Sequence, residues 1–221
     1  MADTPTITII RSKRSTVALH VLPDGSLEVK APMLMPKFFI NRFIEKNKEW
    51  IQKRTALVQQ KKALEKIYKD GEAFLYLGET YPLVLRNVSR IEIAEGKLFY
   101  PQAIKFRIKK EIEQWYIAQA KEIITREVKR YAKEMNTTYT DLTFSDTKSQ
   151  WGRCTHDNRL QFSWRLVMTP LLVLRYVVVH ELAHTFEKNH SYLFWSKVRS
   201  VNPSYKQQIK WLKENGNTLV V

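Results

Sequence analysis

Apolar and polar positions alternate in short runs near the start of the chain, a pattern typical of β-strands. Residues 6–11 alternate weakly, and residues 16–22 and 27–30 are rich in residues that favour strands. The four residues between the last two runs, Pro23-Asp24-Gly25-Ser26, form a turn sequence. We therefore expect a β-hairpin close to the N-terminus.

One helix is expected from about residue 36 to residue 66, because apolar side chains recur there at helical spacing. The stripe consists of Phe39, Phe43, Ile44, Trp50, Ile51 and Leu57. A second β-rich segment is expected over residues 72–100, with a short hairpin signal at Glu95-Gly96. Residues 1–100 are therefore predicted to be an N-terminal β-rich region with one helix.

Residues 101–221 are predicted to form a second domain. A helix is expected over residues 101–135, with apolar residues at helical spacing and many lysines and arginines between them. Strands are expected within residues 141–167, on both sides of a loop at 149–157. Two shorter helices are expected near 191–200 and 203–215.

Between these strands and the last two helices, a further helix is predicted to begin at Thr169-Pro170. Threonine would be the N-cap and proline the first helical residue. The run Leu171–Val179 is apolar on almost every side, which indicates a buried central helix.

This central helix carries the candidate chemistry, His180-Glu181-Leu182-Ala183-His184, and a third histidine follows at His190. At about 100° per residue, histidines four positions apart lie one above the other, so both can reach one ion. Glu181 can approach a water held by that ion without binding the ion itself. Two helical histidines, a third ligand and an open position are typical of zinc hydrolases, in which the ion lowers the pKa of water toward about 7.

His190 would point away from the other two histidines on a continuous helix, so the chain must turn after about Glu187. Asn189 is the expected turn residue, because asparagine tolerates the left-handed conformation. The spacing resembles the metzincin pattern H-E-x-x-H-x-x-G-x-x-H, with Glu187 at the glycine position. The alternative is a buried helix with incidental histidines.

Charge adds a second indication. The 221 residues carry a net charge of +15, which favours anionic partners such as nucleic acid or a nucleoprotein. A basic but merely solvated helix surface over residues 101–135 is the alternative. The single cysteine, Cys154, allows no intrachain disulfide, no apolar run approaches the ~20 residues of a membrane span, and no signal-type run opens the chain. We expect a cytoplasmic protein without a membrane partner.

Several runs around the motif resemble one known family. They are Ser149–Cys154, Leu160–Leu166, Val177–His184, Asn189–Ser191 and Phe194-Trp195. Together they look like the YgjP-like metallopeptidase family, also called the DUF45 family, which is similar to the SprT-like and WLM groups. The resemblance implies an α+β, zincin-like domain with a buried HExxH helix against a small mixed or antiparallel sheet. It also implies His180, His184 and His190 as metal ligands and Glu181 as the catalytic carboxylate.

The expected cofactor is one Zn²⁺, with another divalent ion such as Ni²⁺ as the alternative. Tyr192 is a candidate hydrogen-bond donor in catalysis, and Glu187 could accept a hydrogen bond from a ligand imidazole. The roles of Arg153, Cys154, His156 and Arg165 stay open.

The first function hypothesis is a peptidase acting on peptides or proteins. The alternatives are a metal-dependent phosphohydrolase acting on nucleotides and a nucleic-acid-binding module with a structural metal site.

Overall fold

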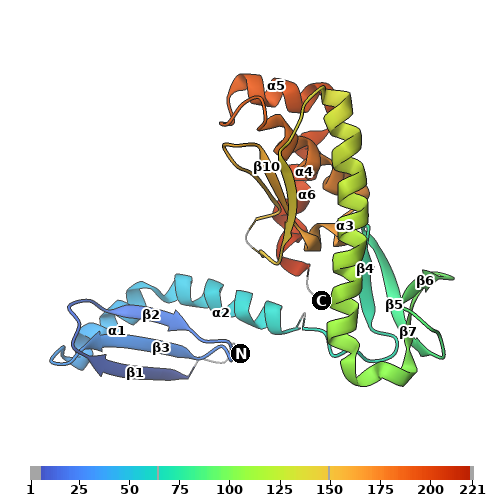
Figure 1. Cartoon of the computed structure of the whole chain (residues 1–221). Coiled ribbons are helices and arrows are strands. Elements are labelled where there is room, and N and C mark those ends of the chain that lie inside the picture. Colours follow the sequence, from blue (N-terminus) through green and yellow to red (C-terminus); the bar gives the residue numbers. More distant parts are fainter. Residues whose placement is uncertain (1–5, 64, 149, 220–221) are drawn as a thin grey trace. The chain divides into compact units, whose positions relative to one another are not determined.

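The computed structural model describes residues 6–63, 65–148 and 150–219. Leu64 and Ser149, which fall within an expected helix and an expected loop, lie outside these ranges. The protein is a mixed α+β structure with small sheets (Figure 1). It divides into two compact units, Met1–Glu65 and Lys66–Val221.

The first unit contains a three-stranded sheet in the order β1-β3-β2 and two helices. Their bounds are β1 Ile7–Ser12, β2 Ala18–Val21, β3 Leu27–Pro32, α1 Lys37–Lys46 and α2 Lys48–Ala63. The predicted hairpin is confirmed, since β2 and β3 pair antiparallel around the turn. Alternate residues of β3 are buried against the helices, and the core consists of Leu27, Val29, Ala31, Ile40 and Ile51.

The helix expected over residues 36–66 is interrupted at Asn47. The side-chain amide of Asn47 donates to the carbonyl oxygen of Phe43 at 2.7 Å, where a continuous α-helix would use the Asn47 backbone N–H. That N–H donates instead to Ile44. The side chain thus competes with the backbone for one acceptor, and two helices result.

The second unit begins with a four-stranded sheet in the order β4-β5-β7-β6, followed by a long helix. The bounds are β4 Ala73–Tyr76, β5 Glu79–Arg86, β6 Glu92–Ala94, β7 Lys97–Pro101, η1 Gln102–Arg107 and α3 Ile108–Met135. One face of α3 is buried along its length, from Ile112 to Met135. The sheet packs against the first half of this helix (Figure 1).

A second small sheet and three helices complete this unit. The bounds are β8 Asp141–Ser145, β9 Gly152–Cys154, β10 Arg159–Ser163, η2 Trp164–Met168, α4 Leu171–Ala183, α5 Tyr192–Val201, α6 Tyr205–Asn215 and η3 Gly216–Thr218. The strand order is β8-β10-β9, with β10 parallel to β8 and antiparallel to β9. Helix α4 contacts α3, α5, α6 and β9, which confirms a buried central helix.

Two local expectations about the start of this helix are wrong. The strand expected to reach Val167 ends at Ser163, because the next five residues form η2 and are all buried. A run without alternation does not distinguish a strand from a helix. Thr169 is not the N-cap; Pro170 is, and the Thr169 hydroxyl donates to the carbonyl of Leu166 at 2.8 Å.

The two compact units separate at Glu65/Lys66, at a different place from the domain boundary expected between residues 100 and 101. The apolar residues of the second β-rich segment, including Phe74, Leu83 and Leu98, belong to the same core as α3 and α4. These strands therefore complete the second unit. Among the described helices, none is long and apolar enough to cross a lipid bilayer.

Candidate metal centre

The three predicted histidines converge at the C-terminal end of α4. Their ligand atoms all lie within 4.8 Å of one another, and the two Nε2 atoms of His180 and His190 are 3.1 Å apart. This is the group of potential metal ligands found among the described residues. Because the three histidines come from two elements, the fold rather than the helix alone builds the site.

The turn that returns His190 to the site starts earlier than expected. Helix α4 ends at Ala183, and His184 is its C-cap residue. Asn189 acts in this turn through its side chain, which accepts a hydrogen bond from the Ser191 N–H at 3.1 Å. Its backbone is not left-handed, so that part of the expectation is wrong. Ser191 then caps α5 by accepting from the Phe194 N–H.

Two of the rings have a fixed partner for their second nitrogen. Nδ1 of His184 lies 2.9 Å from the carbonyl oxygen of Glu187, so this nitrogen must carry the proton. Nδ1 of His180 lies 3.3 Å from the hydroxyl of Tyr176. With a proton on Nδ1, each ring presents the Nε2 lone pair to the other histidines. This is the donor set and tautomer that a divalent ion of the zinc type requires.

Burial keeps these rings neutral. Desolvation, with smaller effects of the neighbouring histidines, lowers the pKa of His180 to about 3. Desolvation also lowers the pKa of His184, although its hydrogen bond to Glu187 opposes the shift. A neutral imidazole is the form that binds a metal, so two of the three histidines, His180 and His184, are already in the protonation state that metal binding needs.

Phe194 forms the apolar support of the three rings. Its ring centroid lies 4.9, 4.5 and 4.7 Å from those of His180, His184 and His190. Phe194 is fully buried, and Trp195 stacks on His190 with centroids 5.6 Å apart. The sequence assigned these two aromatics only to a helix and to a family motif. Their packing against the histidine rings depends on how α5 packs on α4.

Glu181 faces strand β9. Only 6% of this residue is exposed, and the Cys154 backbone N–H donates to its carboxylate. A Cβ on Gly152 would lie 2.6 Å from Cγ of Glu181, so only glycine leaves room for the carboxylate. Desolvation raises the pKa of Glu181 to about 8, and the Cys154 hydrogen bond only partly opposes this. No pattern in the sequence indicated this role of Gly152.

The remaining candidate residues differ in their exposure and in their position relative to the three histidines. Tyr192 is the first residue of α5 and is 79% exposed. Arg153 and His156 are exposed, and neither joins the histidine group. Cys154 is half-buried, with its Sγ 3.9 Å from Nζ of Lys188.

Arg165 has a structural role instead. Its guanidinium is buried, forms an ion pair with Asp146 and lies 4.1 Å from the ring centroid of Trp164. For Glu187, the carbonyl oxygen rather than the expected carboxylate accepts from His184.

A helix that carries H-E-x-x-H, with a third histidine returned to it by a turn, defines a metallopeptidase-type site. Comparison with protein families matches residues 15–215 to the family described as "YgjP-like, metallopeptidase domain", and the chain belongs to this family. The match covers most of both compact units. Searches of the curated proteins and of the solved structures give no match.

Proposed function

We propose that this protein is a zincin-like metallopeptidase that hydrolyses peptide bonds. The observation that carries the proposal is the convergence of three histidine ring nitrogens within 4.8 Å, at the end of a helix in which the buried Glu181 directly follows His180. Membership of the YgjP-like metallopeptidase family supports it.

His180, His184 and His190 would hold one divalent ion, with Zn²⁺ the best fit to three neutral imidazoles. A bound zinc ion supplies a Lewis acid that polarises a carbonyl group and acidifies a water molecule. The Glu187 carbonyl, which can only accept, fixes His184 in the tautomer that such binding needs, and the Tyr176 hydroxyl can accept from Nδ1 of His180 in the same tautomer.

Glu181 is the proposed general base. Its carboxylate takes a proton from the attacking water and then donates it to the amine that leaves. The Cys154 N–H and the close surface of Gly152 hold the carboxylate in one position. Tyr192, which is exposed at the start of α5, is the proposed donor to the substrate carbonyl oxygen.

A peptide substrate is favoured over a nucleotide by strand β9. This strand lies at the end of its sheet, pairs with β10 on one side only, and its first residue contacts Glu181. A free strand edge binds extended polypeptide through backbone hydrogen bonds. The arrangement therefore offers a way to place a peptide bond next to the carboxylate.

Elemental analysis tests the metal site without any activity assay. About one zinc per chain is expected for the wild type, and His184→Ala should lose most of it because three ligands become two. Phe186→Ala, in the same turn but not a ligand, is the control and should retain the metal. No bound metal in the wild type, even after loading with zinc, would refute the site.

Glu181→Gln tests the chemistry. It should retain the metal and lower the cleavage rate of an unstructured protein such as casein by about 10²–10⁴-fold. Phosphate release from nucleoside triphosphates, lost in Glu181→Gln and without any peptide cleavage, would overturn the peptidase proposal in favour of a phosphohydrolase.

A further inference from the structure

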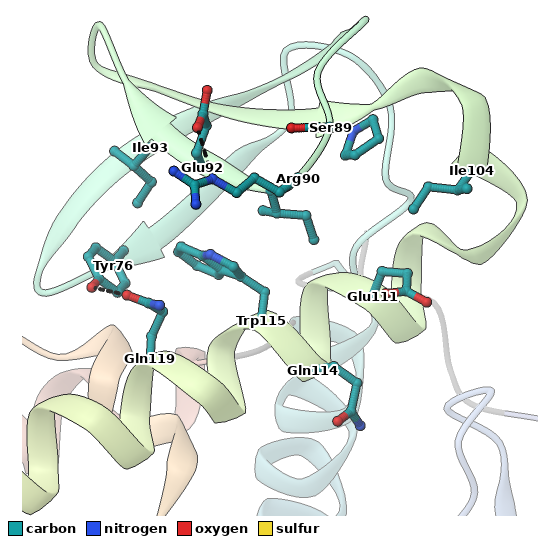
Figure 2. A pocket seen from close by; sticks show the side chains of 12 residues that line it. Tyr76, Ser89, Arg90, Glu92, Ile93, Ile104, Glu111, Gln114, Trp115 and Gln119 are labelled. Carbon is teal, nitrogen blue, oxygen red and sulfur yellow. Dashed lines mark hydrogen bonds and ion pairs between the residues drawn. The ribbon is translucent and has the colours of Figure 1, made fainter.

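A cleft of the second unit lies away from the histidines. It has a volume of about 830 Å³ and lies between the β4–β7 sheet and the first half of α3 (Figure 2). Trp115 and Gln119 line it from the helix, and Arg90 and Glu92 line it from the opposite side. A cleft of this size accommodates several residues of a polypeptide or one medium-sized ligand.

The helix side of the cleft is preformed and aromatic. The Tyr76 hydroxyl donates to Oε1 of Gln119 at 2.8 Å, and the rings of Tyr76 and Trp115 are 5.2 Å apart. Trp115 also contacts Tyr116, whose hydroxyl donates to the Leu75 carbonyl. These contacts hold Trp115 half-exposed in the cleft, where its indole can pack against an apolar side chain.

The opposite side of the cleft includes the free edge of a sheet. Strand β6 is the last strand of its sheet and pairs only with β7, through a two-residue turn in which Glu95 and Gly96 both have positive φ. In such a hairpin, the two residues that flank the turn exchange backbone hydrogen bonds with each other. Along the two strands, every second pair of opposite residues does the same. The N–H and C=O of Ile93 therefore point away from β7.

This edge borders the cleft. Ile93 lies opposite the buried Leu98 and so faces the core side of the sheet, while Glu92 faces the other side. Both residues nevertheless line the cleft. A cavity reached from both faces of one strand lies along the edge of that strand, where backbone groups are open to a new partner.

The charge of the cleft contrasts with that of the chain. Glu92 forms an exposed ion pair with Arg90, whereas no ion pair to Glu111 is found among the described residues. Arg107, one turn before Glu111, lies over the ring of Phe106. Against a net charge of +15, the cleft thus presents an unpaired carboxylate to its ligand. It suits a cationic side chain and disfavours a polyanion.

We propose that this cleft binds an extended polypeptide segment with apolar residues and a lysine or arginine, which adds as a strand to the free edge of β6. Backbone hydrogen bonds to Ile93 would give affinity, packing on Trp115 would select an apolar side chain, and Glu111 would select the basic one. The site is separate from the histidines, so binding here does not depend on the proposed peptidase activity.

The test uses a fluorescein-labelled peptide of about ten residues, with alternating valine and threonine and one central lysine. Binding is measured by fluorescence anisotropy on the full-length Glu181→Gln protein, which prevents cleavage of the probe. Glu111→Lys should weaken binding by about fivefold or more, as expected for reversal of an exposed charge contact. Glu134→Lys, an equal charge change on an exposed residue of the same helix, should leave it unchanged.

A second pair of probes tests the strand addition. A peptide with N-methyl groups on alternate residues cannot donate to the Ile93 carbonyl, and it should bind at least about tenfold more weakly. A peptide with glutamate in place of lysine should also bind more weakly. Two-dimensional amide NMR should show shifts of the Ile93 N–H and the Trp115 indole N–H on addition of the lysine probe.

Three results would overturn the proposal. One is equal binding of the lysine probe to Glu111→Lys and Glu134→Lys, which would place the probe elsewhere, for example at β9. Another is the absence of binding at millimolar probe. The third is a concentration-dependent self-association that Glu111→Lys abolishes, which would assign the cleft to a second copy of this chain. None of these results bears on metal binding or on the effect of Glu181→Gln on cleavage.

Discussion

The carboxylate of Glu181 has room beside strand β9 only because residue 152 is a glycine. Gly152→Ala would place a methyl group 2.6 Å from Cγ and 2.7 Å from Oε1 of Glu181, so the carboxylate or strand β9 must move. We expect peptide cleavage to fall by about 10²-fold or more, because proton transfer depends on this position, with no loss of bound metal. Arg153→Ala, on the next and exposed residue, is the control. Unchanged cleavage by Gly152→Ala would contradict the role given to Glu181.

Asp146 predicts a pH dependence of stability. Burial alone would raise its pKa, but hydrogen bonds from Arg165 and Trp164 and the charge of Arg165 hold the pKa below its usual value. A carboxyl whose folded pKa is depressed stabilises the fold above its unfolded pKa, and the stabilisation is lost as the pH falls through the folded pKa.

Asp146→Asn tests this dependence. It should reduce the free energy of unfolding by only about 0.5–1 kcal/mol near pH 7, because the carboxylate is largely exposed, and by almost nothing near pH 2. Denaturant unfolding at both pH values measures the difference. Asp157→Asn, which removes an exposed carboxylate paired with Arg159, provides the comparison for a surface ion pair. An equal loss for Asp146→Asn at both pH values would show that the carboxylate charge does not contribute.

At the residue scale, the sequence indicated the three candidate metal ligands but not the groups that contact them. Two histidines four positions apart and a third after a turn are local features from which helix geometry predicts a group that could hold a metal ion. The partners of the imidazoles depend on packing. Tyr176 is four residues before His180 and still looked like one more apolar position, and the Glu187 contact uses a backbone carbonyl that no side-chain pattern reveals.

At the scale of elements, the β4–β5 turn predicts a stability effect. Gly78 has a φ of +86°, and a Cβ there would lie 2.8 Å from Pro170, the residue that precedes α4. Gly78→Ala should therefore lower the free energy of unfolding by about 2–4 kcal/mol, since it adds a clash to backbone strain. Gly96→Ala has similar strain but open space, and should cost about 1 kcal/mol. Thermal unfolding of both variants compares them, and equal losses would show that the contact with Pro170 is unimportant.

Helices α3 and α4 were predicted as elements, but not all of their ends were. Helix α3 has a clear period and ends at Met135 as expected, although residues 102–107 form η1 and the α-helix begins only at Ile108. Helix α4 has no such period, because it is apolar on almost every side, and it was predicted from that apolar run and the Thr169-Pro170 start. The misassigned elements depend on single hydrogen bonds or on uniform burial. Asn47 divides a helix through one side-chain bond, and the run Trp164–Met168 is apolar on all sides. Neither feature changes the hydrophobic period on which sequence reasoning relies.

At the scale of the whole molecule, the compact units divide at a different place from the predicted domain boundary. Strand-rich composition before residue 100 and helices after it indicated a boundary there, but composition does not show which strands share a core. Phe74, Leu83 and Leu98 share one hydrophobic core with α3 and α4, although they are far from α4 in the sequence. The candidate metal centre therefore lies in a unit that includes the second β-rich segment as well as the HExxH helix.

This division predicts that the second unit folds without the first. The two hydrophobic cores share no residue: one contains residues from Tyr68 to Leu219, and the other contains residues from Ile9 to Ile51. A fragment of residues 66–221 therefore retains every apolar contact of its own core. We expect it to unfold cooperatively and to bind the same amount of zinc per chain as the full protein, measured by circular dichroism and elemental analysis. His184→Ala in the fragment is the control for specific metal binding. A fragment that is unfolded, or folded without metal, would show that the first unit is needed to build the site.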